Sequence, residues 1–109
     1  MHVDIVVTQP GIRNSYLSLG RVHPDFFPPE CYGTKRRRGA RLSLEVEGIR
    51  EPVLTDIDPA GRFFRNRRWS RRFFREQGLR AGDVVRIERV GSSSYRIYRQ
   101  PEQGGSKTA

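Results

Sequence analysis

The stretch from Gly61 to Val85 reads GRFFRNRRWSRRFFREQGLRAGDVV, and it joins a basic loop to an amphipathic helix and then to a strand. Arginines and aromatic residues are interleaved in the part before Glu76. The arginines are Arg62, Arg65, Arg67, Arg68, Arg71, Arg72 and Arg75, and the aromatics are Phe63, Phe64, Trp69, Phe73 and Phe74. Such a mixture is more typical of a nucleic-acid contact than of a plain solvated surface. We therefore expect a loop that touches a polyanion and is fastened to a β-rich body.

The later part of this stretch has the spacing of one short amphipathic helix. Its apolar residues share one helical face, and they are Trp69, Phe73, Phe74 and, after a break, Leu79. We expect the three rings to lie in the core rather than to stack on bases. The solvated side carries Arg71, Arg72 and Arg75. Gly78 predicts the end of the helix, in the left-handed conformation, and Ser70 and Asn66 are equally good candidates to cap its start.

The composition favours one small domain with an anionic partner. The chain has 109 residues, a formal net charge of +9 and a pI near 11.0, which points to nucleic acid or an acidic surface. Of its 21 basic residues, all but Lys35 and Lys107 are arginine. The planar guanidinium fork suits bidentate contacts to phosphate and guanine, although a skewed codon composition is an alternative cause.

Cysteine usage and hydropathy predict a cytoplasmic protein. Cys31 is the only cysteine, which rules out an intramolecular disulfide and a cysteine-rich zinc site. The amino terminus has no basic leader followed by an apolar run, and the chain has no succession of about 18 apolar residues. We therefore expect neither secretion nor a membrane span.

Alternating apolar residues predict six or seven short strands. The expected strands cover residues 3–7, 16–22, 42–46, 53–57, 84–90 and 95–98. Gly48, the DPAG sequence at 58–61 and the GSSS sequence at 91–94 predict turns. With one clear helix and no βαβ alternation, a closed or nearly closed β-barrel satisfies the strand edges best. Residues 1–99 would form this domain, and residues 100–109 are expected to be a disordered tail.

Two connections between these elements carry polar or basic residues. The first, QPGIRNS at 9–15, is expected to be the protruding tip of a hairpin between the first two strands. Gln9, Arg13, Asn14 and Ser15 are residue types that read base edges or hold phosphates, although an ordinary turn facing water is an equal alternative. The second, TKRRRG at 34–39, is hereafter the basic loop. It carries Lys35, Arg36, Arg37 and Arg38, which are expected to contact phosphates without regard to sequence, although a flexible charged run is the commoner alternative.

Between these connections lies HPDFFPP at 23–29. Its prolines exclude a long helix, but Pro24 is tolerated at a first helical position and predicts one helical turn. This turn would bury Phe26 and Phe27 against the barrel.

Two motifs resemble the DNA-binding pseudobarrel family, which includes plant B3 transcription-factor domains and the amino-terminal effector domains of some type II restriction endonucleases. They are HPDFFPP at 23–29 and RRWSRRFFREQGLRAGDVVRI at 67–87. The second is similar to the family's run of an aromatic residue, a short amphipathic helix, a leucine and glycine-aspartate before a strand. The resemblance covers about residues 3–99 and implies an open pseudobarrel of six or seven strands with one or two short helices.

In that family two loop arms grip the major groove of DNA. By position, the resemblance implies a first arm of Gln9, Ile12, Arg13, Asn14, Ser15 and Tyr16. It implies a second arm over residues 61–68, in which Arg62, Arg65, Asn66, Arg67 and Arg68 reach the groove or its phosphates. No catalytic domain like that of the restriction enzymes follows. The chain would therefore be a free-standing binder or a fragment of a larger protein.

Catalysis finds little support in the residues. Asp56 and Asp58 have no lysine nearby in the sequence, and His2 and His23 are too isolated for a histidine-metal nuclease. We expect no enzyme, metal, cofactor, small-molecule substrate or membrane partner. The leading hypothesis is a protein that binds double-stranded DNA sequence-specifically and without catalysis. An RNA-binding barrel and a protein-interaction or antitoxin-like barrel remain alternatives.

Overall fold

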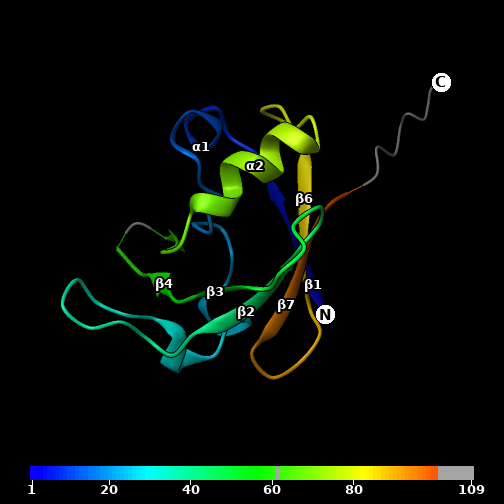
Figure 1. Ribbon diagram of the computed structural model, residues 1–109. Helices are drawn as coiled ribbons and strands as arrows, with labels where there is room; N and C mark the ends of the chain where they lie inside the picture. The colour runs from blue at the N-terminus through cyan, green and yellow to red at the C-terminus, as the bar shows by residue number, and fades with distance from the viewer. Residues whose placement is uncertain (61, 101–109) are drawn as a thin grey trace.

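The fold is mainly β, as expected. The computed structural model describes residues 1–60 and 62–100 (Figure 1). Its strands are β1 His2–Val6, β2 Leu42–Val46, β3 Val53–Thr55, β4 Ile57–Asp58, β5 Phe63–Phe64, β6 Val84–Arg89 and β7 Ser94–Arg99. Its helices are α1 Gln9–Asn14 and α2 Arg68–Glu76, with two 3-10 turns, η1 Pro24–Phe26 and η2 Pro29–Cys31.

Five strands form one sheet in the order β1-β6-β7-β2-β3, and β4 pairs with β5 as a separate hairpin. Strands β2 and β7 pair in parallel, and the other strand pairs of the described residues are antiparallel. The sheet does not close into a barrel, because β1 and β3 form its two edges and do not pair with each other. The strand expected at 16–22, which would have extended the sheet beyond β1, does not form.

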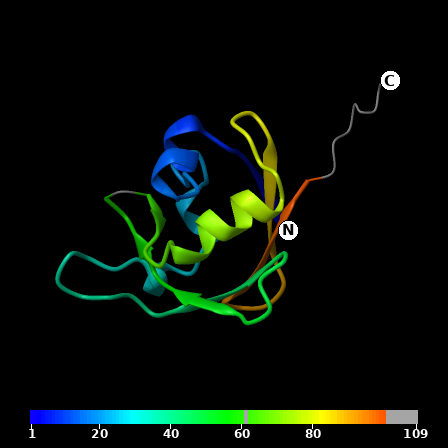
Figure 2. The same cartoon turned by 45° about the horizontal axis from the view of Figure 1, so that its top comes forward.

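The sheet curves around α2, whose aromatic face lies against the core (Figure 2). Trp69, Phe73 and Phe74 are buried, as expected, and Phe73 is completely enclosed. The core is continuous from these rings to Phe64 and Phe27, which contact each other edge to face at 5.8 Å between centroids. Such burial of large rings is the main stabilising term of a small domain.

Gly78 ends α2 as the sequence predicts, with a φ of 62°, and the Leu79 amide donates to the Phe74 carbonyl at 2.9 Å. The start of the helix differs from expectation. Its N-cap is Arg67, whose side chain makes no capping bond. Ser70 is buried inside the first turn, so it is not the cap. Asn66 Oδ1 only reaches the Arg68 amide, at 3.4 Å.

The loop expected at 9–15 is the helix α1, and this prediction was wrong. Thr8 Oγ1 accepts a hydrogen bond from the Gly11 amide at 3.0 Å, and Pro10 occupies the first turn. A side-chain cap followed by proline starts a helix, a combination that the turn-forming composition concealed. The helix ends at Asn14, and its C-cap Ser15 has a φ of 62°.

Residues 16–22 alternate like a strand without being one. Leu17 and Leu19 are buried. The alternation of apolar and polar residues therefore arises because every second side chain packs against the core, although this segment pairs with no strand. The expected hairpin between the first two strands is consequently absent. The strand expected over 53–57 is also divided: β3 pairs with β2, whereas Ile57 pairs with Phe64 in the β4–β5 hairpin.

The helical turn expected at Pro24 is η1, and both phenylalanines beside it are buried. The Tyr95 hydroxyl donates to the Phe26 carbonyl at 2.9 Å, which fastens this turn to β7. Gln100 follows the end of β7, and its amide donates to the Val84 carbonyl. Residues 101–109 of the expected tail lie outside the described residues. None of the described helices has the length and apolar character to cross a bilayer.

Candidate nucleic-acid interface

Three polar or basic segments lie on the same side of the molecule. They are α1, the β4–β5 hairpin and the basic loop, all in the left half of Figures 1 and 2. Tyr16, just after α1, contacts Phe63 of β5 with 5.6 Å between ring centroids. Arg65, just after β5, donates from Nη2 to the Thr34 carbonyl of the basic loop at 3.2 Å. The hairpin is therefore joined to both of its neighbours.

The contact between the two expected arms includes a cation. The guanidinium carbon of Arg67 lies 4.8 Å from the centroid of the Phe63 ring, which also contacts the Tyr16 ring. A guanidinium over an aromatic face is held by the ring quadrupole. Phe63 is therefore half-buried and is contacted by both Tyr16 and Arg67. It aligns Arg67 beside the end of the first arm.

Arg62 fastens the turn of the hairpin to the segment after α1. Its Nη1 donates to the Gly20 carbonyl at 2.8 Å, and its own carbonyl accepts from the Leu19 amide at 2.8 Å. The residue has a φ of 57°, a left-handed conformation that costs energy for a side chain with a Cβ. These bonds offset that cost. Gly61, the first residue of the expected second arm, lies outside the described residues.

Arg65 forms an ion pair with a buried carboxylate. Its Nε donates to both oxygens of Asp56, at 2.9 and 3.0 Å, and the Gly39 amide donates to Asp56 Oδ2 at 2.8 Å. Burial raises the pKa of Asp56, but the hydrogen bonds from Arg65 and Gly39 outweigh burial and hold the pKa below 3.8. The same pair raises the pKa of Arg65. Asp56 thus ties the hairpin to the end of the basic loop.

The basic loop is closed on itself. The Thr34 amide donates to the Arg37 carbonyl at 2.6 Å, and the Arg37 amide donates to Thr34 Oγ1 at 2.9 Å. Beyond it, the Ala40 amide donates to the Glu30 carbonyl at 2.7 Å. All four of its cationic residues are exposed: Lys35, Arg36, Arg37 and Arg38. The loop therefore presents its charges from a turn that is fixed at both ends.

A recess of about 370 Å³ lies between the basic loop and the start of α2. Its lining comprises Arg38, Arg41, Leu54, Thr55, Asp56, Arg65, Asn66 and Arg68. Four arginines and one carboxylate leave a net positive charge, and Arg65 already neutralises the carboxylate. The remaining guanidiniums make the recess suitable for an anion such as a phosphate group.

The protein gives no detectable match in comparison with known proteins. No family model, curated protein or solved structure matches this chain. Any function must therefore be inferred from the geometry and charge of these segments.

The expected residues of the first arm divide by exposure. Gln9, Arg13 and Asn14 are exposed on α1, whereas Ser15 and Tyr16 are half-buried at its end. Gly11 cannot gain a side chain, because an added Cβ would lie 2.6 Å from the Tyr16 carbonyl oxygen. The polar side chains of α1 are thus carried by a helix packed closely on the chain that follows it.

Some of the cations on the described part of the molecule are paired with carboxylates. On the outer face of the sheet, Arg86 binds Asp4 at 2.9 Å and Arg96 binds Glu45 at 3.1 Å. Among the described residues, no carboxylate pairs with the cations of the candidate interface: Arg13, Lys35, Arg36, Arg37, Arg38, Arg67 and Arg68. The candidate interface therefore carries positive charge that no carboxylate pairs with in the described part of the chain.

Sequence reasoning missed Arg41 and the role of Asp56. Arg41 precedes Leu42, which points inward, so strand alternation places Arg41 outward beside the basic loop. Asp56 lies between the buried residues Thr55 and Ile57. A carboxylate in an otherwise inward-facing sequence indicates a buried cationic partner, and this signal was available.

Proposed function

We propose that this chain is a sequence-specific, non-enzymatic binding domain for double-stranded DNA. In this proposal α1 and the β4–β5 hairpin enter the major groove together, and the basic loop holds the flanking backbone. The observation that carries the proposal is the ring contact between Tyr16 and Phe63. It brings two polar segments, far apart in sequence, to one side of a rigid body.

The proposed roles follow from how each side chain is engaged. Arg13 and Asn14 are exposed, and Arg67 is aligned by Phe63, so these three residues are assigned to base edges. The basic loop, with Arg68 and the recess beside it, is assigned to phosphates. Arg62 and Arg65 already donate to protein acceptors, and they are assigned to positioning the arm, with partial contact to the backbone of the DNA.

The burial of the aromatic residues favours duplex DNA over single strands or RNA. Proteins that bind single strands stack bases on exposed aromatic rings. Here Trp69, Phe73 and Phe74 lie in the core, and Phe63 is half-buried in contact with Tyr16 and Arg67. The exposed residues are guanidiniums and amides on braced segments, which suit the donor and acceptor pattern of the major groove.

We also propose that the fold is an open pseudobarrel of the B3 kind. The two motifs that suggested this family form regular elements: HPDFFPP supplies η1 and the buried Phe26, and the second motif supplies α2 and then β6. A curved five-stranded sheet enclosing one amphipathic helix, with a separate hairpin beside it, supports the proposal.

Selection from a pool of random-sequence duplexes tests the function. We expect enrichment of a short motif, and the variants Asn14→Ala and Arg67→Met are expected to relax base preference at particular positions by about 1–3 kcal/mol each. Arg37→Met is expected to weaken binding to all sequences, with a shallower salt dependence.

The matched control is Arg96→Met, which removes the same charge from the outer face of the sheet. Competition with duplex RNA and single strands at one salt concentration completes the test. Absence of an enriched motif would refute sequence specificity. If RNA binds more strongly than duplex DNA, RNA is the ligand and the proposal of a DNA-binding domain is refuted.

A further inference from the structure

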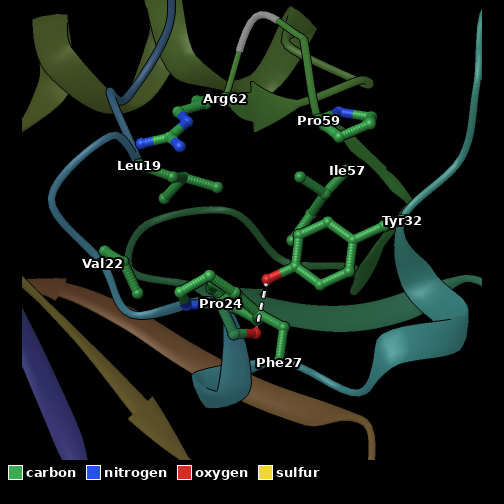
Figure 3. Close-up of a pocket in the computed structure, with 8 residues that line it drawn as sticks. All are labelled: Leu19, Val22, Pro24, Phe27, Tyr32, Ile57, Pro59 and Arg62. Carbon is green, nitrogen blue, oxygen red and sulfur yellow. Dashed lines mark hydrogen bonds between the residues drawn. The ribbon is translucent and has the colours of Figure 1, made fainter.

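A pocket lies between the β4–β5 hairpin and the segment that follows α1. Figure 3 shows its lining, which comprises Leu19, Val22, Pro24, Phe27, Tyr32, Ile57, Pro59 and Arg62. Leu19, Phe27 and Ile57 are buried and provide apolar walls. Pro24, Pro59 and Arg62 are exposed and surround the opening. The pocket is therefore apolar inside and carries one cation at its opening.

The two polar side chains of the lining differ in charge. Burial raises the pKa of Tyr32 to about 12, so its phenol stays neutral. That hydroxyl donates to the Pro24 carbonyl at 2.7 Å (Figure 3). Arg62 uses Nη1 for the Gly20 carbonyl, and among the described residues no acceptor is bound to its Nε or Nη2. One guanidinium edge thus remains for an anion.

The volume of the pocket, about 190 Å³, limits the size of its ligand. A dry apolar cavity of about 150 Å³ holds one benzene molecule, whereas sites for drug-sized ligands start at about 300 Å³. One ring with a small substituent, or a short aliphatic chain, is the size that fits. Water is a poor occupant because the walls offer few polar partners.

We propose that this pocket binds a small apolar monocarboxylate, such as an aromatic acid of one ring or an aliphatic acid of about six carbons. Its hydrocarbon part lies against Leu19, Phe27 and Ile57, and its carboxylate pairs with the free edge of Arg62. A nucleobase turned out of a duplex is a poorer fit, since its several polar edge atoms would find only Arg62 and Tyr32 as side-chain partners.

The position of Arg62 links this pocket to the proposed DNA-binding function, and this part of the inference rests on that function. Arg62 belongs to the expected second arm and holds the hairpin to Leu19 and Gly20. A bound carboxylate competes with DNA phosphates for its guanidinium. Linkage then requires that the acid and DNA weaken each other's binding by the same factor, which makes the acid a negative effector.

Binding of the acid is measured first, without DNA, by NMR titration of the whole chain. The probes are benzoate, hexanoate, benzamide and acetate. Benzoate and hexanoate are expected to bind with dissociation constants on the order of 1 mM or lower. Benzamide lacks the charge and acetate lacks the hydrocarbon, and both are expected to bind at least about 10-fold more weakly.

Three variants locate the site. Arg62→Met is expected to weaken benzoate about 10-fold or more, and Val22→Phe is expected to abolish binding by filling the pocket. Arg80→Met, with the same loss of charge on an exposed residue outside the lining, is expected to change nothing. Circular dichroism and thermal unfolding verify that each variant is folded. Equal affinity of Arg62→Met and the unaltered chain for benzoate would overturn the proposal, as would shifts away from the pocket.

DNA binding is then measured with and without benzoate at constant ionic strength. We expect about a 5-fold or greater loss of DNA affinity, and no such loss in Val22→Phe. Failure to bind any nucleic acid while benzoate still binds would refute the proposed function and leave the pocket assignment intact. DNA binding that benzoate leaves unchanged would refute the effector role alone.

Discussion

The ion pair between Arg65 and Asp56 provides the sharpest test of how the interface is held. In the variant Arg65→Met the carboxylate of Asp56, which is 3% exposed, loses both hydrogen bonds from Arg65 and keeps the one from the Gly39 amide. Removing one member of a buried pair costs about 3–5 kcal/mol. The side chain of Arg65 is 26% exposed, so water compensates partly and we expect about 3 kcal/mol.

The assay is urea unfolding followed by circular dichroism, with thermal unfolding as a second measurement. A loss of about 3 kcal/mol corresponds to a melting temperature lower by roughly 12–24 °C in a domain of this size. Arg72→Met is the matched control, because Arg72 pairs with Glu76 on the exposed surface of α2. Its cost is expected to be about 0.5 kcal/mol or less. Equal stability of the two variants would refute the assignment of Arg65 as a buried brace.

The pH dependence of stability gives a second criterion with a definite sign. The folded-state pKa of Asp56 lies below 3.8, so its stabilising contribution is present above the unfolded pKa and is lost as pH falls through the folded pKa. In Arg65→Met the hydrogen bonds and the charge of Arg65 no longer lower the pKa of Asp56, so the effect of burial dominates and this pKa is expected to rise. Stability of the variant should then decrease as pH rises above about 4. The double variant with Asp56→Asn is expected to recover part of the loss, because no unpaired charge remains.

Three further predictions concern stability and salt dependence. Gly33→Ala is expected to be strongly destabilising in urea unfolding, because a Cβ there would lie 2.5 Å from Asp56 Oδ2 and 2.7 Å from Arg65 Nη2. For Gly78→Ala, the added Cβ would have no neighbour within 4 Å, and only the positive φ of 62° opposes the substitution. Its expected cost is therefore only about 1 kcal/mol. Phe73→Ala is expected to cost about 3–5 kcal/mol in the same assay, since the ring is fully buried. If each exposed cation of the basic loop contacts one phosphate, removing it should reduce the slope of log K against log salt by about 0.9, and an unchanged slope for Arg37→Met would exclude that contact.

The elements governed by a single local rule were predictable from the sequence. The helical spacing of Trp69, Phe73 and Phe74 predicted α2 and its buried face. Gly78 predicted the end of the same helix, so the two signals agreed. Pro24 specified the turn η1 in the same way. In each case the local preference and the burial required by the fold point to the same structure.

The errors arose where local rules compete. In residues 9–15 the turn-forming composition outweighed the capping of Thr8 and the proline in the first turn. Over 16–22 the alternation came from burial of Leu17 and Leu19 in irregular chain, because inward packing alone produces a period of two. Closure of the sheet depends on whether its two edge strands meet, a property that no short stretch of sequence contains. Strand spacing therefore could not predict that the sheet stays open.

The candidate interface combines these local and non-local determinants. Charge and residue type marked Arg67 and the basic loop, but only tertiary contacts decide which guanidiniums are available: Arg65 is bound to Asp56, whereas Arg67 lies over Phe63. These contacts connect the basic loop, the hairpin and the end of α1 in series. Side chains held in place before binding lose less conformational entropy when they engage a ligand. Substitutions of Asp56 and Phe63 should therefore weaken DNA binding although neither residue is assigned a DNA contact, and their effects should be non-additive, because both act on the same hairpin.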